Sequence, residues 1–230
     1  MNIFYTPPEN VQNDRLELLD QEMKHATKVL RYSEGDDITV VDGVGGWYDG
    51  TIRHIAKKTA VVEIANQKTI SPPEPVLTLG LGVIKKRDRL EFAVEKAVEL
   101  GARRVALFKS KHTERDRIRM DRLENIALSA MKQSLRSWRP EVTLYPSLSN
   151  LVEDYSGSSM LIAHEKSGAD AGIPPEKMDD SSLTLLVGPE GGFSEHEVQE
   201  VCDAGGEVVS LGSYRLRAET AALVMMSQFI

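Results

Sequence analysis

The alternation of strand-like and helix-like segments after residue 75 is the feature that most constrains the fold of this chain. Residues 76–84, VLTLGLGVI, are nearly all apolar, as in a strand that is buried on both faces. Residues 88–100 follow with an apolar stripe at helical spacing, and strand-like and helix-like segments alternate from there onward. This order predicts an α/β domain with a mostly parallel sheet and helices on both faces.

Residues typical of helix ends refine the boundaries in this half. Asp88 and Glu91 are spaced for a capping box at the start of one helix, and Gly101 is placed to end it. Ser194 and Glu197 have the same spacing at the start of a later helix. The other expected strands are 104–108, 142–145, 160–163, 183–187 and 208–211, and the other expected helices are 122–135, 195–204 and 218–230.

Residues 1–70 have a different pattern, with strand-like runs close together and no long helix. The runs are 38–41, 47–55 and 59–64, with a glycine-rich hairpin turn at 42–46 and a short helix expected over 20–31. Such a pattern predicts a small β-barrel. Residues 66–75 are polar and proline-rich and indicate a linker, so we expect one domain over 1–70 and a second over 71–230.

Composition bounds the compartment and excludes some kinds of site. The only cysteine is Cys202, so the chain has neither an intrachain disulfide nor a cysteine-based zinc site, which favours a reducing compartment. The first residues lack a signal-peptide pattern and no apolar run reaches bilayer length, so we expect a cytoplasmic protein. His112, His164 and His196 are too scattered to suggest a metal site, and none is expected.

Charge is distributed unevenly along the chain. The net charge of −7 by itself argues against a nucleic-acid partner. Residues 85–139, however, contain 16 Lys and Arg against 8 Asp and Glu, a local balance of +8. This segment is a candidate phosphate-binding face, although solvated helices with salt-bridged surfaces explain the same pattern equally well.

Two glycine-containing loops each join a late strand to a helix. In open α/β sheets ligands bind where strands end, and glycine allows bends and close backbone approaches that other residues do not. The first loop is 188–193, GPEGGF, and the second is 212–217, GSYRLR. Neither has a Walker A sequence or the spacing of a dinucleotide fold. Alone, the loops indicate a ligand site or tight connections between elements.

These two loops, GPEGGFS at 188–194 and LGSYRLRAETA at 211–221, resemble those of the ribosomal RNA small subunit methyltransferase E family. The resemblance covers almost the whole chain, and its less specific matches are His25, 29–31, 35–36, 42–43, Lys86, 88–89, Glu91, Lys96, 99–101, 114–115, Gln133, Arg136 and Pro140. There are departures. Ser129 and Lys132 replace two acidic residues of the family's middle helix, and Tyr214-Arg215-Leu216-Arg217 stands where the family usually has Arg-Ile-Leu-Arg.

The resemblance implies a fold and an activity. The fold is a SPOUT methyltransferase domain with a deep trefoil knot, preceded by a PUA-like RNA-binding β-barrel. The activity is transfer of a methyl group from S-adenosylmethionine to N3 of a uridine in 16S ribosomal RNA. The implied partners are the small ribosomal subunit and a second copy of the chain in a homodimer, with no membrane. A non-catalytic RNA-binding assembly factor and a SPOUT enzyme for another RNA nucleotide remain as alternatives.

The resemblance also implies residue roles. Arg217, Glu219 and Glu190 are the candidate catalytic residues: Arg217 to stabilise a uridine anion or hold a phosphate, or else only to form a salt bridge, and Glu190 as a base or a ribose contact. The expected cofactor-binding residues are Val187, Gly188, Pro189, Glu190, Gly191, Gly192, Leu211, Gly212, Ser213, Leu216, Thr220 and Ala221. The expected RNA-binding residues are His25, Lys28, Arg31, Lys86, Arg87, Arg89, Arg115, Gln133 and Arg136.

Overall fold

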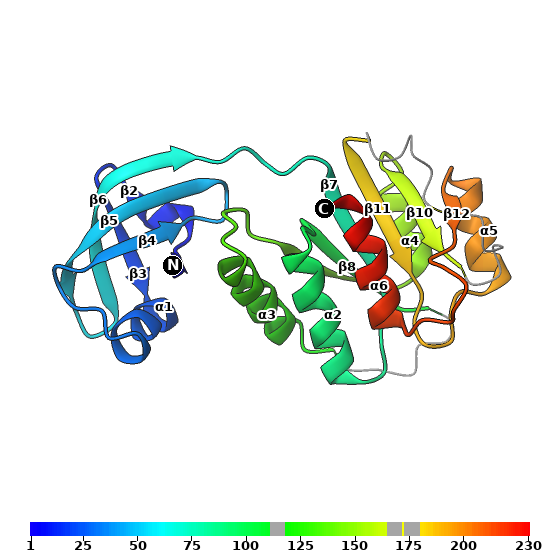
Figure 1. Cartoon of the computed structure of the whole chain (residues 1–230), viewed down its shortest axis with the longest axis horizontal. Helices are drawn as coiled ribbons and strands as arrows, with labels where there is room; N and C mark the ends of the chain where they lie inside the picture. Colours follow the sequence, from blue (N-terminus) through cyan, green and yellow to red (C-terminus); the bar gives the residue numbers. More distant parts are fainter. Residues whose placement is uncertain (111–117, 165–171, 173–179) are drawn as a thin grey trace. The chain divides into compact units, whose positions relative to one another are not determined.

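The structure is a computed structural model that describes residues 1–110, 118–164, 172 and 180–230 (Figure 1). The chain forms two compact units. The first consists of Met1–Pro72 together with Met131–Arg139, and the second of Pro73–Ala130 together with Pro140–Ile230.

The return of Met131–Arg139 to the first unit has no sign in the sequence pattern. Backbone and side-chain bonds hold this segment. The Trp138 Nε1–H donates to the carbonyl oxygens of Ile70, at 3.0 Å, and Ser71, at 3.1 Å. The backbone N–H of Arg139 donates to the carbonyl oxygen of Gly43 at 2.9 Å. The glycine-rich turn expected at 42–46 therefore also forms a backbone hydrogen bond with this distant segment.

The first unit is built on a six-stranded sheet in the order β1-β4-β5-β6-β3-β2. The strands β4, β5 and β6 correspond to the predicted runs, but β6 continues through residues expected to be linker. The short strands β1, β2 and β3 were not predicted. The bounds are β1 (Ile3–Tyr5), β2 (Val11–Gln12), β3 (Arg15–Leu19), β4 (Asp37–Val41), β5 (Gly46–Ile55) and β6 (Thr59–Thr69), with a 3-10 turn η1 (Pro8–Asn10).

The helix expected over 20–31 is shorter and has two parts. It consists of α1 (Asp20–Lys24) and a π-helical turn η2 (His25–Val29). Met23 and Ala26 are buried in the core of the unit with Phe4, Leu16 and other strand residues. Arg31, which follows the turn, has a φ of 63° and so leaves the helical conformation.

The second unit contains a six-stranded sheet in the order β12-β10-β11-β7-β8-β9. Every neighbouring pair is parallel, as predicted. The central strand β7 is buried along its whole length except at half-buried Val76, which fits its unbroken apolar sequence. The bounds are β7 (Val76–Gly82), β8 (Arg104–Phe108), β9 (Glu141–Tyr145), β10 (Ser159–Ala163), β11 (Ser182–Val187) and β12 (Glu207–Val209).

Helices cover both faces of this sheet (Figure 1). The helices α2 (Arg87–Glu99) and α6 (Ala218–Met226) pack against each other, and α4 (Leu148–Asp154) packs against α5 (Glu195–Asp203). The other helices are α3 (Met120–Gln133) and a terminal 3-10 turn η4 (Ser227–Phe229). Among the described residues, no helix combines the length and apolar character needed to cross a bilayer.

The two predicted capping boxes have different outcomes. The one at α5 is confirmed: the Glu197 N–H donates to Ser194 Oγ at 3.3 Å, and the Ser194 N–H donates to Glu197 Oε2 at 2.7 Å. The one at α2 is wrong, because the helix already begins at Arg87 and has no side-chain cap. Glu91 instead accepts bonds of 2.6 and 2.9 Å from Arg122 on α3.

Candidate functional site

Strand register in the second unit brings the two glycine loops together. Ala163 at the end of β10 pairs with Val187 at the end of β11 and with Val209 at the end of β12. The three strands therefore end level with one another. The loops that follow them meet at the carboxyl edge of the sheet, which is where α/β folds bind ligands.

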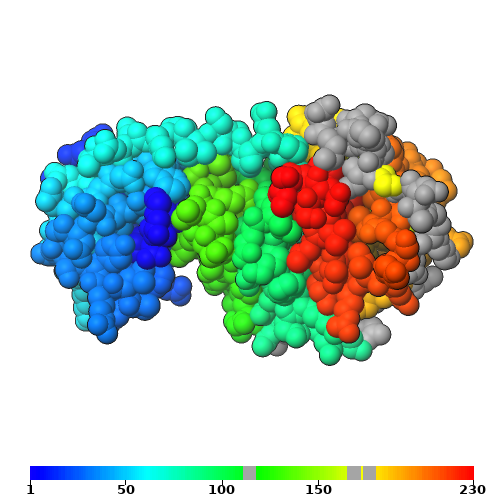
Figure 2. All heavy atoms as spheres, in the orientation of Figure 1, coloured from blue at the N-terminus to red at the C-terminus, as the bar shows by residue number. Residues whose placement is uncertain are grey.

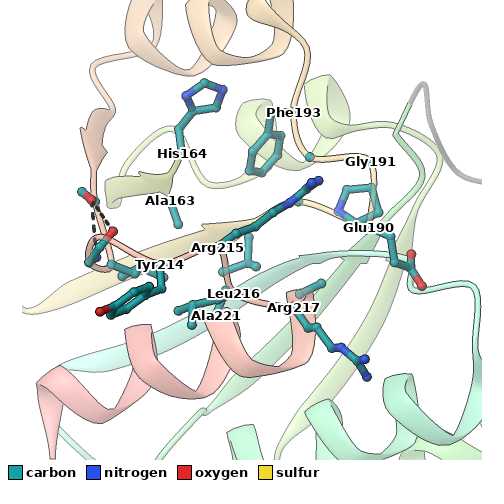
Figure 3. Close-up of a pocket in the computed structure, with 18 of the residues that line it drawn as sticks. Ala163, His164, Glu190, Gly191, Phe193, Tyr214, Arg215, Leu216, Arg217 and Ala221 are labelled. Carbon is teal, nitrogen blue, oxygen red and sulfur yellow. Dashed lines mark hydrogen bonds between the residues drawn. The ribbon is translucent and has the colours of Figure 1, made fainter. Parts of the chain in front are cut away.

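A cavity of about 840 Å³ lies at this edge (Figure 3). It is lined by residues that follow β10, β11 and β12, by the first turn of α6, and by Arg89 of α2. Its volume falls within the roughly 300–1,000 Å³ of small-molecule sites. The cavity is the candidate cofactor site.

The first loop, 188–193, is folded tightly against the end of β7. The Gly192 N–H donates to the carbonyl oxygen of Pro189 at 2.8 Å, and the φ of Gly192 is 69°. A Cβ on Gly82 of β7 would lie 2.4 Å from Pro189 Cδ and 2.5 Å from Pro189 N. Only glycine at position 82 lets the loop approach so closely.

Two further contacts hold this loop in place. Phe193 is buried and stacks on Phe108 of β8, with ring centroids 5.9 Å apart and an interplanar angle of 14°. The Glu190 carboxylate accepts the backbone N–H of Lys85, just after β7. The Glu190 side chain therefore ties the loop to the protein, and Figure 3 shows it at the edge of the lining residues.

Residues 210–217, which include the second glycine loop, follow β12 and lead into α6. Gly212 has a φ of 123°, and its N–H donates to Ser210 Oγ at 3.4 Å. The Arg215 side chain extends toward Gly191 of the first loop, whereas the Arg217 side chain points away from Gly191 (Figure 3). Tyr214 lines the cavity and is 87% exposed, so its ring is open to solvent.

The structure brings together most of the residues that the resemblance indicated. All of the expected cofactor residues line the cavity except Thr220, whose side chain is exposed on the first turn of α6. Of the three candidate catalytic residues, Glu190 and Arg217 line the cavity. Glu219 does not; it is buried and pairs with Arg89 at 3.5 Å between Arg89 Nε and Glu219 Oε1.

The lining chemistry fits a nucleoside-containing cofactor. Val187, Leu211, Leu216 and Ala221 supply apolar surface for a flat ring, and the glycine loops supply backbone groups for its polar edge. A Cβ on Gly192 or Gly212 would meet no atom within 4 Å, so at these positions glycine serves the backbone conformation and leaves the space beside it open. The described residues contain no cluster of His, Cys, Asp and Glu suited to a metal ion.

The expected RNA-binding residues occupy several places. In the first unit His25, Lys28, Arg31 and Gln133 are exposed and Arg136 is half-buried. In the second unit Lys86 and Arg87 are exposed, and Arg89 reaches the cavity. Arg115 lies outside the described residues.

Ion pairs neutralise part of the basic segment 85–139. Arg103 and Arg104 pair with Glu141 at 3.2 and 3.4 Å. Lys132, one of the departures from the family pattern, pairs with Glu22 at 2.5 Å within the first unit. For these residues the salt-bridged reading of the charge pattern is the right one.

Several lining residues were missed by sequence reasoning. The strand-end rule that singled out the loops after β11 and β12 applies equally to the end of β10, and it would have found two of them. The others are neighbours of expected residues within the same loops. The missed residues are Ala163, His164, Phe193, Ser210, Tyr214, Arg215 and Ala218.

Comparison with known families finds two matches along the chain. Residues 72–230 match the family model described as an RNA methyltransferase domain. Residues 18–65 match the model described as an RNA methyltransferase PUA domain.

Individual relatives match over nearly the full length. The chain is 27% identical over 231 residues to the ribosomal RNA small subunit methyltransferase E of Rickettsia conorii, covering 99% of this chain and 94% of the relative. The crystal structure of a ribosomal RNA small subunit methyltransferase E from Neisseria gonorrhoeae, bound to S-adenosyl methionine, is similar with a TM-score of 0.86 and 28% identity, covering 99% of this chain and 96% of that one. The probable rRNA-methyltransferase of Porphyromonas gingivalis has a TM-score of 0.85 and 35% identity over the same shares.

Proposed function

The chain belongs to the ribosomal RNA small subunit methyltransferase E family, and on that premise we propose that it methylates N3 of a specific uridine in 16S ribosomal RNA with S-adenosylmethionine as donor. The observation that carries the proposal is the cavity at three level strand ends, lined by both glycine loops. A relative with the same fold binds S-adenosyl methionine. A degenerate, purely structural pocket would have no need of these intact loops.

The two loops hold the cofactor mainly through backbone. Residues 188–192 and 211–216 line the cavity and would hold the adenine edge and the ribose through their peptide groups, while Leu216 and Ala221 would supply apolar surface for the ring. When bound, S-adenosylmethionine would supply a methyl group activated by a sulfonium, and the neutral thioether S-adenosylhomocysteine would leave as the methyl group is transferred. The protein must then place the uridine nitrogen in line with that methyl carbon.

The N3 proton of the uridine must be removed before or during transfer, because N3 is protonated at neutral pH. A cationic side chain that stabilises the uracil anion lowers this barrier. Arg217 lines the cavity at the N-terminus of α6, where the helix dipole adds positive potential, and it is our candidate for this role. The Glu190 carboxylate already accepts a backbone N–H, which disfavours it as the base, so the N3 proton would pass to solvent water or hydroxide.

The target base must be reached outside a duplex. N3 lies on the Watson–Crick edge, so the uridine is unpaired or flipped out when it reacts. Exposed Tyr214 at the rim is suited to stack on such a base. We propose that the N-terminal module, residues 1–70, binds the RNA first, through His25, Lys28 and Arg31.

Other parts of the proposal come from the family alone. We propose a trefoil knot in residues 71–230, a homodimer as the working form, and the cytoplasm as the compartment, where the small ribosomal subunit is found.

The test measures binding and transfer separately. Calorimetry should show that the full chain binds S-adenosylmethionine; a chain that does not bind it would be a binding factor and not an enzyme. Arg217→Ala should keep that affinity and the fold but lose about 100-fold in methyl transfer to small-subunit RNA, as for the loss of one charge-stabilising donor. The control is Arg104→Ala at the opposite, amino end of β8, which should be fully active. Full activity of Arg217→Ala would refute its role.

A further inference from the structure

Glu219 is a buried carboxylate beside the cavity that does not reach it. Its side chain is 11% exposed, and its Oε2 atom is buried without a hydrogen-bond partner among the described residues. A buried charge is retained only where something compensates it. Here the compensating group is the Arg89 guanidinium, whose Nε lies 3.5 Å from Glu219 Oε1.

Arg89 connects this buried charge to the cavity. It lies in the first turn of α2, 26% of its side chain is exposed, and it is one of the lining residues. The ion pair involves Nε, which leaves the terminal nitrogens of the planar guanidinium for an anion in the cavity. The distance of 3.5 Å is too long for a good hydrogen bond. The pair therefore orients Arg89 by charge attraction and does not fix the guanidinium in one position.

The packing of two helices makes this arrangement possible. Glu219 is in the first turn of α6, and α6 lies beside α2 (Figure 1). The space-filling view shows atoms of the two segments, red for α6 and green for α2, in contact over one face (Figure 2). The N-terminal turns of both helices meet at the Arg89–Glu219 pair, so their dipoles favour an anion at this side of the cavity.

We propose that Glu219 is a positioning residue that holds the Arg89 guanidinium at the cavity wall, where Arg89 binds an anionic oxygen of the RNA substrate. The proposal rests on the proposed function and revises the catalytic role that the resemblance implied for Glu219. That oxygen belongs either to a backbone phosphate or to the uracil anion that forms as N3 loses its proton. Both offer the same chemistry to a guanidinium.

A double-mutant cycle on the full chain tests the coupling. Arg89→Met keeps an unbranched apolar stem but removes the guanidinium and its charge, and Glu219→Gln keeps the shape of the carboxylate and removes its charge. RNA binding is measured by anisotropy with a labelled small-subunit RNA fragment, transfer by single-turnover kinetics, and cofactor binding by calorimetry. S-adenosylmethionine affinity should stay at the wild-type value in all variants.

We expect Arg89→Met to lower either RNA affinity or transfer rate by about tenfold, and Glu219→Gln to lower the same quantity by less. The double variant should be no worse than Arg89→Met alone, because Glu219 acts through Arg89. A phosphate contact lowers affinity and reduces the slope of log affinity against log salt by about one. A contact with the uracil anion lowers the rate and leaves affinity unchanged.

Multiplicative losses in the double variant would overturn the proposal, since they would mean that Glu219 acts on the reaction independently. Wild-type affinity and rate in Arg89→Met would overturn it as well. Should Glu219→Gln fail to fold, Glu219→Asp keeps the charge, and it should show a milder form of the Arg89→Met defect; a defect of another kind contradicts the proposal.

The matched control is Glu95→Gln on α2, the helix that carries Arg89; it neutralises a carboxylate paired with Lys96 at 2.8 Å and should behave as wild type. Absence of methyl transfer by the wild-type chain would count against the proposed function. The binding arm of the cycle would still report whether Arg89 and Glu219 are coupled.

Discussion

The Glu190 carboxylate accepts the backbone N–H of Lys85, with Lys85 N 3.1 Å from Oε1 and 3.2 Å from Oε2. These residues are 105 positions apart in sequence, and the bond joins the glycine loop after β11 to the chain just after β7. The acidic side chain of this loop, Glu190, therefore anchors the backbone that forms the cavity wall. This changes what the side chain is expected to do.

Substitutions of Glu190 distinguish a role as an anchor of the loop from a role as a catalytic base. Glu190→Ala should remove about 1 kcal/mol of loop anchoring and weaken S-adenosylmethionine binding several-fold, because the loop is less well ordered. Glu190→Gln retains an acceptor oxygen and should lose less of both. Calorimetry and transfer assays measure the two effects. A Glu190→Gln variant that binds the cofactor normally but transfers no methyl group would instead indicate a base.

Gly82→Ala should displace the same loop, 188–193, because Gly82 of β7 packs against Pro189. The new methyl group would lie 2.4 Å from Pro189 Cδ and 2.5 Å from Pro189 N, so the loop backbone must move. Such overpacking costs about 1–3 kcal/mol, and we expect lower thermal stability and much weaker S-adenosylmethionine binding. Gly157→Ala is the control, because a Cβ there meets nothing within 4 Å. Equal cofactor affinity in the two variants would contradict this account of the loop.

Arg31 occupies a backbone conformation that glycine adopts more easily, with a φ of 63°. Arg31→Gly removes that strain, offset in part by greater freedom of the unfolded chain, so stability should change little or rise by up to about 1 kcal/mol. RNA affinity should nevertheless fall, since an exposed cation is lost. Arg31→Lys keeps the charge and serves as control. Unchanged RNA affinity of Arg31→Gly, measured by anisotropy, would remove Arg31 from the RNA surface.

Tyr48 makes the stability of the first unit pH-dependent. Burial, and a 3.0 Å hydrogen bond to Asp42 Oδ2, raise the pKa of Tyr48 from 10.0 to about 12. The folded state thus favours the neutral phenol. Its contribution is fully present below pH 10 and is lost as the pH rises from about 10 to about 12.

The comparison with Tyr48→Phe isolates this effect. The variant lacks the hydroxyl, so it should be less stable than wild type near pH 8 by about 1 kcal/mol. The difference between the two proteins should shrink as pH rises through that window, because the other titrating groups are shared. Urea unfolding at several pH values measures it. A constant difference up to pH 12 would mean that Tyr48 is not held neutral.

Periodicity and local chemistry carried the sequence predictions that the structure confirmed. The unbroken apolar run of β7 and the capping box at Ser194 depend on residues close together in sequence, so they could be predicted. The position of both glycine loops followed from the same strand pattern. That three strands end level was not readable from the sequence, because register is set by pairing between distant segments.

Two of the expected site residues, Glu219 and Thr220, lie outside the cavity lining for a geometric reason. Consecutive helix residues point about 100° apart, so a match to a motif does not say which of them faces a ligand. Ala218 and Ala221 line the cavity, whereas Glu219 turns toward Arg89 and Thr220 toward solvent. The return of Met131–Arg139 to the first unit was likewise hidden, since it depends on bonds from Trp138 and Arg139 to residues far away in sequence.

The most direct test of the central claim is to map N3-methyluridine in 16S ribosomal RNA from cells that lack this gene. Nuclease digestion and mass spectrometry should show that the modification disappears from one uridine. The wild-type gene should restore it, and the Arg217→Ala gene should not. An unchanged level of N3-methyluridine at every site in the deletion strain would contradict the proposed activity.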